Sequence, residues 1–162
     1  MKSNELFTIS GKRGYGKTTL AKSLIGQLTR VAIWDPMGEY QHPGRYIPEM
    51  GTLEEFNSWL SGIWQVGNCF ILVDEADFVM PVKKPLIPFA YKVVNTGRHR
   101  NIGMGMITRR IAELNKTAFS QSEHVFLFRH SISNDIRYLA EFIEGVEEIR
   151  NLEKFQYKQY RL

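Results

Sequence analysis

The chain has 162 residues with 43% hydrophobic content, a formal net charge of +4 and an isoelectric point near 9.2. This length supplies one sizeable hydrophobic core and is too short for two ordinary domains, so we expect residues 1–162 to form a single domain. The basic excess is small, and it permits contact with DNA or RNA without requiring it. The single cysteine, Cys69, excludes an internal disulfide, and its apolar surroundings predict a buried thiol in a reducing compartment.

No segment reaches the length of about 18 apolar residues that a membrane-spanning helix needs. The first residues are polar as well, so we expect a soluble intracellular protein with no transmembrane segment of its own. The histidines show no metal-ligand spacing with one another or with Cys69, which argues against a zinc site.

Short apolar runs alternate with amphipathic stretches along the whole chain. In chain order, we predict elements at residues 6–10 (strand), 17–28 (helix), 31–34 (strand), 52–60 (helix), 69–73 (strand), 89–96 (helix), 102–108 (strand), 111–115 (helix), 125–128 (strand), 134–143 (helix) and 155–160 (strand). Thr52 would cap the second helix, with Glu55 completing a capping box. Strands separated by helices predict a three-layer α/β fold with a mainly parallel central sheet.

The turn between the first strand and the first helix matches a phosphate-binding pattern, G-x-x-x-x-G-K-[ST]. Its glycines allow main-chain N–H groups to curl around a phosphate at the positive end of the helix. Lys17 would reach the β- and γ-phosphates of ATP, and the Thr18 hydroxyl would ligate Mg²⁺. The predicted ATP-binding residues are Gly11, Lys12, Arg13, Gly14, Tyr15, Gly16, Lys17, Thr18 and Thr19.

Two acids, Asp74 and Glu75, directly follow the apolar strand 69–73. Ligands of open parallel sheets bind at this carboxyl edge, so Asp74 would hold Mg²⁺, partly through water. Glu75 would polarise a water molecule for attack on the γ-phosphate. Many small-molecule kinases lack this second acid. Together with strand 31–34, which precedes the acid strand in sequence, it favours a hydrolysing P-loop NTPase of the RecA-like, additional-strand (ASCE) class.

The aromatic residues are expected to lie mostly in the core. Phe155, Tyr157 and Tyr160 alternate along the last predicted strand and could flank a nucleotide base. An edge strand packed on the core is the simpler interpretation of that alternation.

Three further stretches together resemble the HerA/FtsK superfamily of P-loop ATPases. The turn Asp35-Pro36-Met37-Gly38-Glu39-Tyr40 resembles the D-P-x-G-E-Y of HerA-type DNA translocases. The run Gly97-Arg98-His99-Arg100-Asn101-Ile102-Gly103 and residues 104–109 resemble the family's G-R-x-x-G-I-G, strand, A-T-Q-R-P region. The likeness continues through residues 112–115 and 125–128, and covers about residues 6–142.

This resemblance implies a homo-oligomeric ring, a hexamer or a pentamer, that hydrolyses ATP to move double-stranded DNA without sequence specificity. The chain is hardly longer than the ATPase core, as in the genome-packaging ATPases of membrane-containing viruses and phages. Such a motor would act in the host cytoplasm or on the virion, with a portal or virion membrane protein as a further partner.

The resemblance also implies roles for individual residues. Carried over by position, Arg98 would be the arginine finger that reaches the γ-phosphate bound by a neighbouring subunit. The family's polar sensor after the fourth strand is usually Gln, whereas here Thr108 is followed by Arg109. Either Arg109 senses the γ-phosphate or the sensor role has moved. The predicted catalytic residues are Lys17, Glu75, Arg98 and Arg109, and the candidates for DNA contact are Lys83, Lys84 and Arg110.

Three other functions stay open. A Zot-like phage morphogenesis ATPase would need a membrane anchor, which this sequence does not show. A P-loop kinase acting on a nucleotide or metabolite could use Arg109 and Arg110 as lid residues, but Glu75 and the turn at 35–40 argue against it. A nucleotide-dependent binding module would show ATP affinity without turnover.

Overall fold

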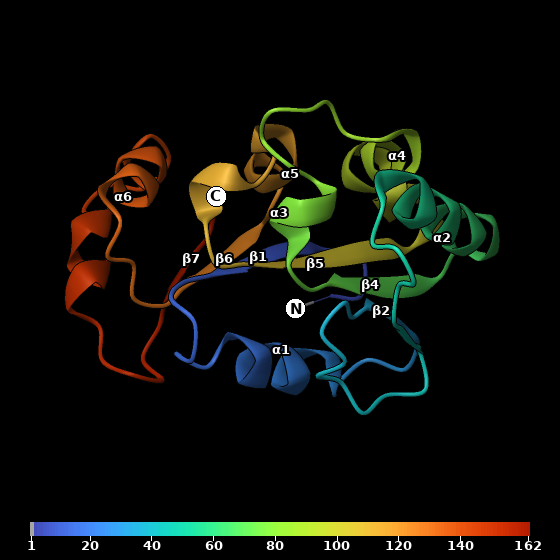
Figure 1. Cartoon of the computed structure of the whole chain (residues 1–162), viewed down its shortest axis with the longest axis horizontal. Helices are drawn as coiled ribbons and strands as arrows, with labels where there is room; N and C mark the ends of the chain where they lie inside the picture. Colours follow the sequence, from blue (N-terminus) through green and yellow to red (C-terminus); the bar gives the residue numbers. More distant parts are fainter. Residues whose placement is uncertain (1) are drawn as a thin grey trace.

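A seven-stranded sheet with helices on both faces forms the middle of the molecule (Figure 1). The computed structural model describes residues 2–162. The strand order is β3-β2-β4-β5-β1-β6-β7, and neighbouring strands are parallel except for β7, which is antiparallel to β6. The strands are β1 (Leu6–Ser10), β2 (Val31–Trp34), β3 (Arg45–Tyr46), β4 (Cys69–Val73), β5 (Ile102–Thr108), β6 (His124–Leu127) and β7 (Lys158–Tyr160).

The helices divide between the two faces of the sheet. Helix α1 lies on one face, and helices α2, α3, α4 and α5 lie on the other (Figure 1). The α-helices are α1 (Lys17–Ile25), α2 (Leu53–Val66), α3 (Ala76–Val79), α4 (Pro88–Thr96), α5 (Lys116–Ser120) and α6 (Ser133–Ala140), and the 3₁₀ helices are η1 (Gly97–Arg100), η2 (Ile111–Glu113) and η3 (Val146–Asn151). Within the part of the chain that the structure describes, none of the helices has the length and apolar character of a membrane span.

Two hydrophobic cores, one on each face of the sheet, hold these layers together. Successive strand residues point to opposite faces, so Phe7 and Ile9 of β1 pack with Ile25 of α1. Ile71 and Val73 of β4 belong to the larger core on the other face. Each strand at the centre of the sheet is therefore buried on both sides, as parallel sheets require.

The predicted fold class, a three-layer α/β fold with a mainly parallel sheet, is confirmed. Strands 6–10, 31–34, 69–73 and 102–108 lie at the predicted residues. Continuous apolar runs are easy to recognise because both of their faces are buried. The two-residue strand β3 was not predicted, since it is too short to leave a pattern.

Some local predictions were wrong because a side chain has a different partner from the one expected. Thr52 caps α2, and its Oγ1 accepts a hydrogen bond from the Glu55 N–H at 3.2 Å. The Glu55 carboxylate instead accepts from the N–H groups of residues 49–51, so the capping box does not form. The helix predicted near 111–115 is present only as the short 3₁₀ helix η2 at Ile111–Glu113. The α-helix that follows begins at Lys116, because the Asn115 side chain accepts hydrogen bonds from the N–H groups of Thr117 and Ala118.

Two further expectations need correction. Cys69 is partly exposed at the start of β4 rather than buried. The last strand begins at Lys158, so residues 155–157 of the predicted strand lie outside the sheet.

The sheet order determines where the functional residues meet. Strand β5 lies between β1 and β4 and is parallel to both. The carboxyl ends of these three strands therefore form one edge, which carries the glycine-rich loop after β1, the acids after β4 and the arginines after β5.

Candidate active site

The loop between β1 and α1 takes the conformation that its glycines allow. Gly11, Gly14 and Gly16 have φ angles of 147°, 77° and 108°. Gly16 is the N-cap of α1, and no side chain caps this helix. The first N–H groups of α1 are thus free to bind an anion beside the loop.

The Lys17 side chain folds back onto the main chain of the phosphate loop. Its buried ammonium donates hydrogen bonds to the carbonyl oxygens of Gly11 at 2.8 Å and Lys12 at 3.2 Å. Burial lowers the pKa of Lys17, and the negative charges of Glu75 and Asp74 oppose that shift. The loop therefore holds a cation where the phosphates of a nucleotide would enter.

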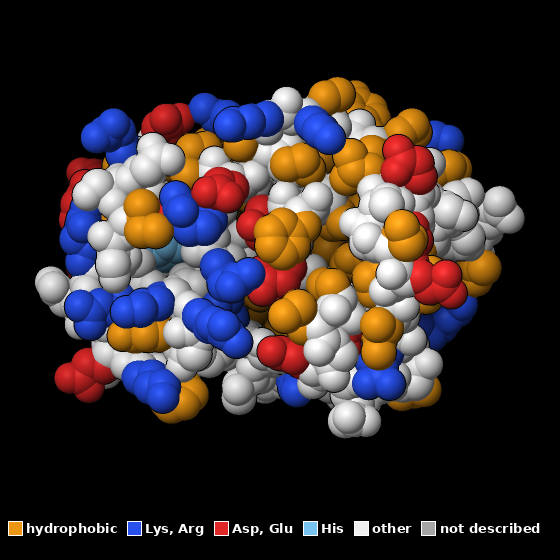
Figure 2. All heavy atoms as spheres, viewed as in Figure 1, with side chains coloured by type: hydrophobic (Ala, Val, Ile, Leu, Met, Phe, Trp, Pro, Cys, Tyr) orange, Lys and Arg blue, Asp and Glu red, His pale blue; other side chains and the backbone are white. Residues whose placement is uncertain are grey.

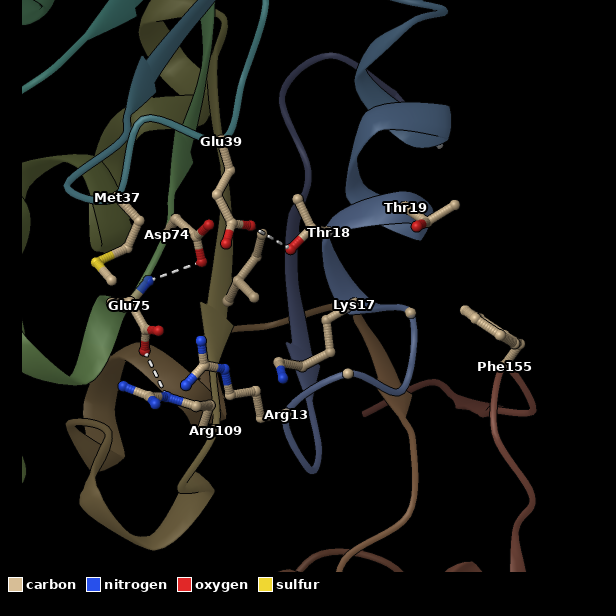
Figure 3. A pocket seen from close by; sticks show the side chains of 13 residues that line it. Arg13, Lys17, Thr18, Thr19, Met37, Glu39, Asp74, Glu75, Arg109 and Phe155 are labelled. Carbon is tan, nitrogen blue, oxygen red and sulfur yellow. Dashed lines mark hydrogen bonds and ion pairs between the residues drawn. The ribbon is translucent and has the colours of Figure 1, made fainter.

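Asp74 and Glu75 follow β4 as predicted, in two different environments. Asp74 is 6% exposed, and burial raises its pKa to about 6. Its Oδ1 accepts a hydrogen bond from the Glu75 N–H at 2.9 Å. Glu75 adopts a left-handed backbone conformation with φ 49°, which is costly for a residue with a side chain and is typical of functional sites. This turn separates the two carboxyl groups, as Figure 3 shows.

Glu39 is a further residue of the site. The sequence pattern identified it only as part of the turn at residues 35–40 and did not predict a role for its side chain. Its Oε2 accepts a hydrogen bond from the Thr18 hydroxyl at 3.2 Å (Figure 3). The buried carboxylate of Asp35 holds the turn by accepting from the N–H groups of Glu39 and Tyr40, each at 2.9 Å. The turn thereby brings a third carboxylate to the site.

Arg109 projects into the site from the end of β5. Its Nε donates to Glu75 Oε2 at 3.1 Å, and the Arg13 guanidinium lies next to it (Figure 3). Thr108 faces elsewhere, because its buried hydroxyl donates to Asp77 at 2.7 Å. Of the two residues at this strand end, Arg109 is therefore the one beside the cavity.

These side chains surround a cavity of about 320 Å³. Of the predicted ATP-binding residues, Arg13, Gly14, Gly16, Lys17, Thr18 and Thr19 line it, together with Glu39, Asp74, Glu75 and Arg109. Gly11 and Lys12 contribute the carbonyl groups that bind Lys17, and Tyr15 packs against the core under α1.

Phe155 lines the same cavity, which corrects the simpler interpretation of the C-terminal aromatics. Its N–H donates to the Tyr15 carbonyl at 3.1 Å, and its backbone is left-handed with a φ of 68°. The ring is 64% exposed and lies on the far side of the loop from Glu75 (Figure 3). Tyr157, by contrast, packs against Phe126 and Phe128.

Arg98 lies apart from the other predicted catalytic residues. It belongs to η1, which precedes β5, so it is at the amino edge of the sheet. At about 3.3 Å per residue, the length of β5 separates it from the cavity edge by roughly 20 Å. Its exposed guanidinium makes no hydrogen bond or ion pair with any residue between 2 and 162.

The donor atoms at this site suit Mg²⁺ that arrives with a nucleotide. Among residues 2–162, no group of three or more His, Cys, Asp or Glu side chains could hold a metal ion on its own. Asp74 and the Thr18 hydroxyl offer the oxygen ligands that Mg²⁺ prefers, and phosphate oxygens and water commonly supply the rest. The chain therefore fits a magnesium nucleotide better than a free ion.

Comparison with solved structures agrees with this geometry. The DNA-packaging ATPase B204 of Sulfolobus turreted icosahedral virus superposes with a TM-score of 0.86 at 18% identity, covering 99% of this chain and 94% of that one. The genome packaging NTPase B204 of Sulfolobus turreted icosahedral virus 2, in complex with AMPPCP, gives 0.83 at 18% identity with the same coverage. The chain has the fold of the P-loop NTPases.

The N-terminal domain of zonular occludens toxin from Neisseria meningitidis also has a similar fold. Its TM-score is 0.64 at 18% identity, with 78% of each chain covered. Neither a scan against protein-family models nor a search of curated proteins found a match. The resemblance that the sequence motifs indicated is thus found again in the fold.

The raised pKa of Asp74 predicts a pH-dependent stability effect. In the unfolded chain this carboxyl ionises near its ordinary pKa of 3.8, whereas in the fold it ionises near 6, so folding is penalised increasingly as pH rises between those values. Asp74→Asn should therefore raise the free energy of unfolding by about 3 kcal/mol at pH 7 and by little at pH 4. Urea unfolding without nucleotide measures both values.

Exposed Glu144 provides the matched control, and Glu144→Gln should leave stability unchanged at both pH values. An Asp74→Asn effect of equal size at pH 4 and pH 7 would show that the fold does not raise the pKa of this carboxyl.

Proposed function

We propose that this protein is an ATPase that couples hydrolysis to translocation of double-stranded DNA, as the packaging motor of a virus or phage. The proposal of ATP hydrolysis rests on one observation. The phosphate loop, Lys17, Asp74 and Glu75 line the same cavity. The resemblance in motifs and the fold of the viral packaging NTPases support the coupling to DNA.

The chemistry follows from the positions of the charged groups. Loop N–H groups and Lys17 would hold the β- and γ-phosphates, and bound Mg²⁺, held by Thr18 and Asp74, would offset negative charge on the phosphate oxygens. A water oxygen forms a bond to the γ-phosphorus while the bond to the bridging oxygen breaks and ADP leaves with the electron pair. Glu75 accepts the water proton.

Arg109 would act as the γ-phosphate sensor. It forms an ion pair with Glu75 at the cavity wall, whereas Thr108 is occupied by Asp77. A γ-phosphate beside Lys17 would compete for the Arg109 guanidinium and free the Glu75 carboxylate to bind water. Of the two alternatives for the family's sensor Gln, the geometry therefore favours replacement by Arg109.

Phe155 would provide a platform for the adenine base. An exposed ring beside Gly16 lies where the base of a nucleotide held by the loop would extend, away from Glu75. Stacking on an aromatic face stabilises any base, since every base has a π-face.

Arg98 would act on the nucleotide of a neighbouring subunit. A residue at the amino edge of the sheet cannot reach the cavity at the carboxyl edge of its own subunit. A head-to-tail interface would bring the two edges together, and such heterologous contacts close into rings when the rotation permits. This supports a homo-oligomeric ring, a pentamer or a hexamer, with Arg98 as its arginine finger.

DNA contacts would come from cations outside the nucleotide cavity. Lys83 and Lys84 are exposed in the loop after α3 and form no ion pair among the described residues, so both are available to phosphates. Arg110 is a poorer candidate, because Asp135 and Glu113 bind it. In a packaging motor these loops would face DNA while the ring docks on a portal or virion membrane protein, in the host cytoplasm or on the virion.

A Zot-like morphogenesis ATPase is the second candidate, because the zonular occludens toxin domain shares the fold. That protein covers less of this chain and superposes less well than the packaging NTPases do. A P-loop kinase would transfer phosphate to an acceptor and release little of it to water.

Phosphate release from ATP tests the proposed function and locates its chemistry. The wild-type protein should release phosphate without any acceptor, and duplex DNA should accelerate the release. Glu75→Gln should lower turnover by about 10²–10⁴-fold, as expected for loss of a general base, while retaining nucleotide binding. Lys17→Ala should lose both turnover and nucleotide binding. Glu54→Gln, which neutralises an exposed acid on α2, should retain full turnover.

The competing functions give different results in the same assay. Phosphate release that duplex DNA leaves unchanged would contradict the translocase, and nucleotide binding without turnover would indicate a binding module.

Mixing inactive variants tests whether Arg98 acts across a subunit interface. Arg98→Ala and Lys17→Ala should each be inactive alone. In an equimolar mixture, random assembly places an intact Lys17 opposite an intact Arg98 at about one site in four, so turnover should recover to roughly that fraction. Arg100→Ala is the control, because the Arg100 guanidinium contacts Gln65 and Trp64 of its own chain, and this variant should stay active. Failure of the mixture to recover would contradict a shared site.

A further inference from the structure

A second cavity, of about 230 Å³, lies beside the phosphate loop on the side of α6. Arg13 and Arg109 line both this cavity and the nucleotide cavity, so the two are neighbours that share a wall. The remaining basic residues of the second cavity are Lys12, Arg110 and Arg129. Figure 2 shows Lys and Arg side chains gathered over the side of the molecule where the phosphate loop and α6 lie.

The ion pairs leave this second cavity strongly positive. Asp135, 1% exposed, is its acid, and both of its carboxylate oxygens are occupied by Arg110 Nε at 3.0 Å and the Ala112 N–H at 3.1 Å. No carboxylate in residues 2–162 pairs with Lys12, Arg13 or Arg129. The positive charge here is therefore available to an anion.

Two buried polar atoms in the cavity wall also have no partner. His130 is 2% exposed and its Nε2 makes no hydrogen bond, and the Nε of Arg129 is likewise buried without one. The Arg129 Nε–H is always a donor, and a buried donor without a partner is rare in folded proteins unless a ligand or water binds it. Arg129 is anchored at the loop, because its carbonyl oxygen accepts from the Lys12 N–H at 2.9 Å.

The start of α6 adds a further anion-binding element. Ile132 is the N-cap of this helix and lines the cavity, and its side chain cannot accept a hydrogen bond from the first N–H groups. Those groups and the helix dipole favour a negative charge at this end. Guanidinium groups and a helix N-terminus together match the several acceptor oxygens of a phosphate group.

We propose that the second cavity binds the inorganic phosphate released from the γ-position of ATP. This inference rests on the proposed hydrolysis, because the shared arginines put the second cavity next to the place where the γ-phosphate would be cleaved. Because Arg13 and Arg109 line both cavities, the same two guanidinium groups would contact the product anion before and after it moves from the nucleotide cavity to the second cavity. A backbone phosphate of DNA has the same chemistry, but the shared wall favours the product.

Calorimetry with inorganic phosphate tests this proposal on protein saturated with Mg²⁺ and AMPPCP, so that the phosphate loop is occupied. Phosphate should bind at one site per chain. Arg129→Gln should weaken binding about tenfold, the expected effect of losing one charge-assisted contact. Arg129→Lys, which keeps the charge, should restore part of the affinity. Arg137→Gln removes an exposed charge from α6 outside the cavity and should change nothing.

Three results would overturn the assignment. Saturation with AMPPCP could abolish phosphate binding, which would confine the anion to the phosphate loop. Arg129→Gln could bind phosphate as tightly as the wild type. A duplex oligonucleotide could displace the phosphate, which would assign the cavity to nucleic acid.

The proposed ATPase activity and this second site can fail separately. If AMPPCP does not bind, the proposed function fails, and phosphate binding is then measured on Lys17→Ala, in which the phosphate loop is disabled. If Lys17→Ala binds phosphate, and if adding Arg129→Gln to that variant weakens the binding, the second site is still supported. If Lys17→Ala does not bind phosphate, the second site is rejected.

Discussion

The site depends on one buried ammonium group. Lys17 is removed from water at the carboxyl edge of the sheet, where it needs partners that offset the loss of hydration. The carbonyl groups of Gly11 and Lys12 bind it directly, and Asp74 and Glu75 supply opposing charge. These partners come from different strands, so the arrangement exists only because β5 places β1 and β4 on either side of itself.

The same crowding of charge explains how the acids differ. Asp74 is buried close to other carboxylates, which raises its pKa, whereas Glu75 turns away through a left-handed backbone and pairs with Arg109. In this site the cations Lys17 and Arg109 lie close to the carboxylates of Asp74 and Glu75. The negative phosphates of a nucleotide would compete with these carboxylates for the two cations. We infer that nucleotide binding exchanges the contacts of Lys17 and Arg109 for contacts to phosphate, which links occupancy of the cavity to the freedom of Glu75.

Much of this arrangement could be predicted from the sequence because its determinants are local. Four strands are continuous apolar runs, and the glycine pattern before Lys17 fixes a loop between a strand and a helix. Residues whose roles depend on long-range contacts were harder to predict. Glu39 reaches Thr18 only because Asp35 folds the intervening turn, and Phe155 reaches the cavity through a hydrogen bond to Tyr15 in a distant part of the chain. Neither contact leaves a periodic signal.

The central claim is that the loop and the two acids form a magnesium nucleotide site. Calorimetric titration of the wild-type protein with ATP, with Mg²⁺ present and then with Mg²⁺ removed, tests it most directly. The account predicts binding at one site per chain that weakens when Mg²⁺ is removed. Absence of heat at any nucleotide concentration, with the protein folded, would contradict it.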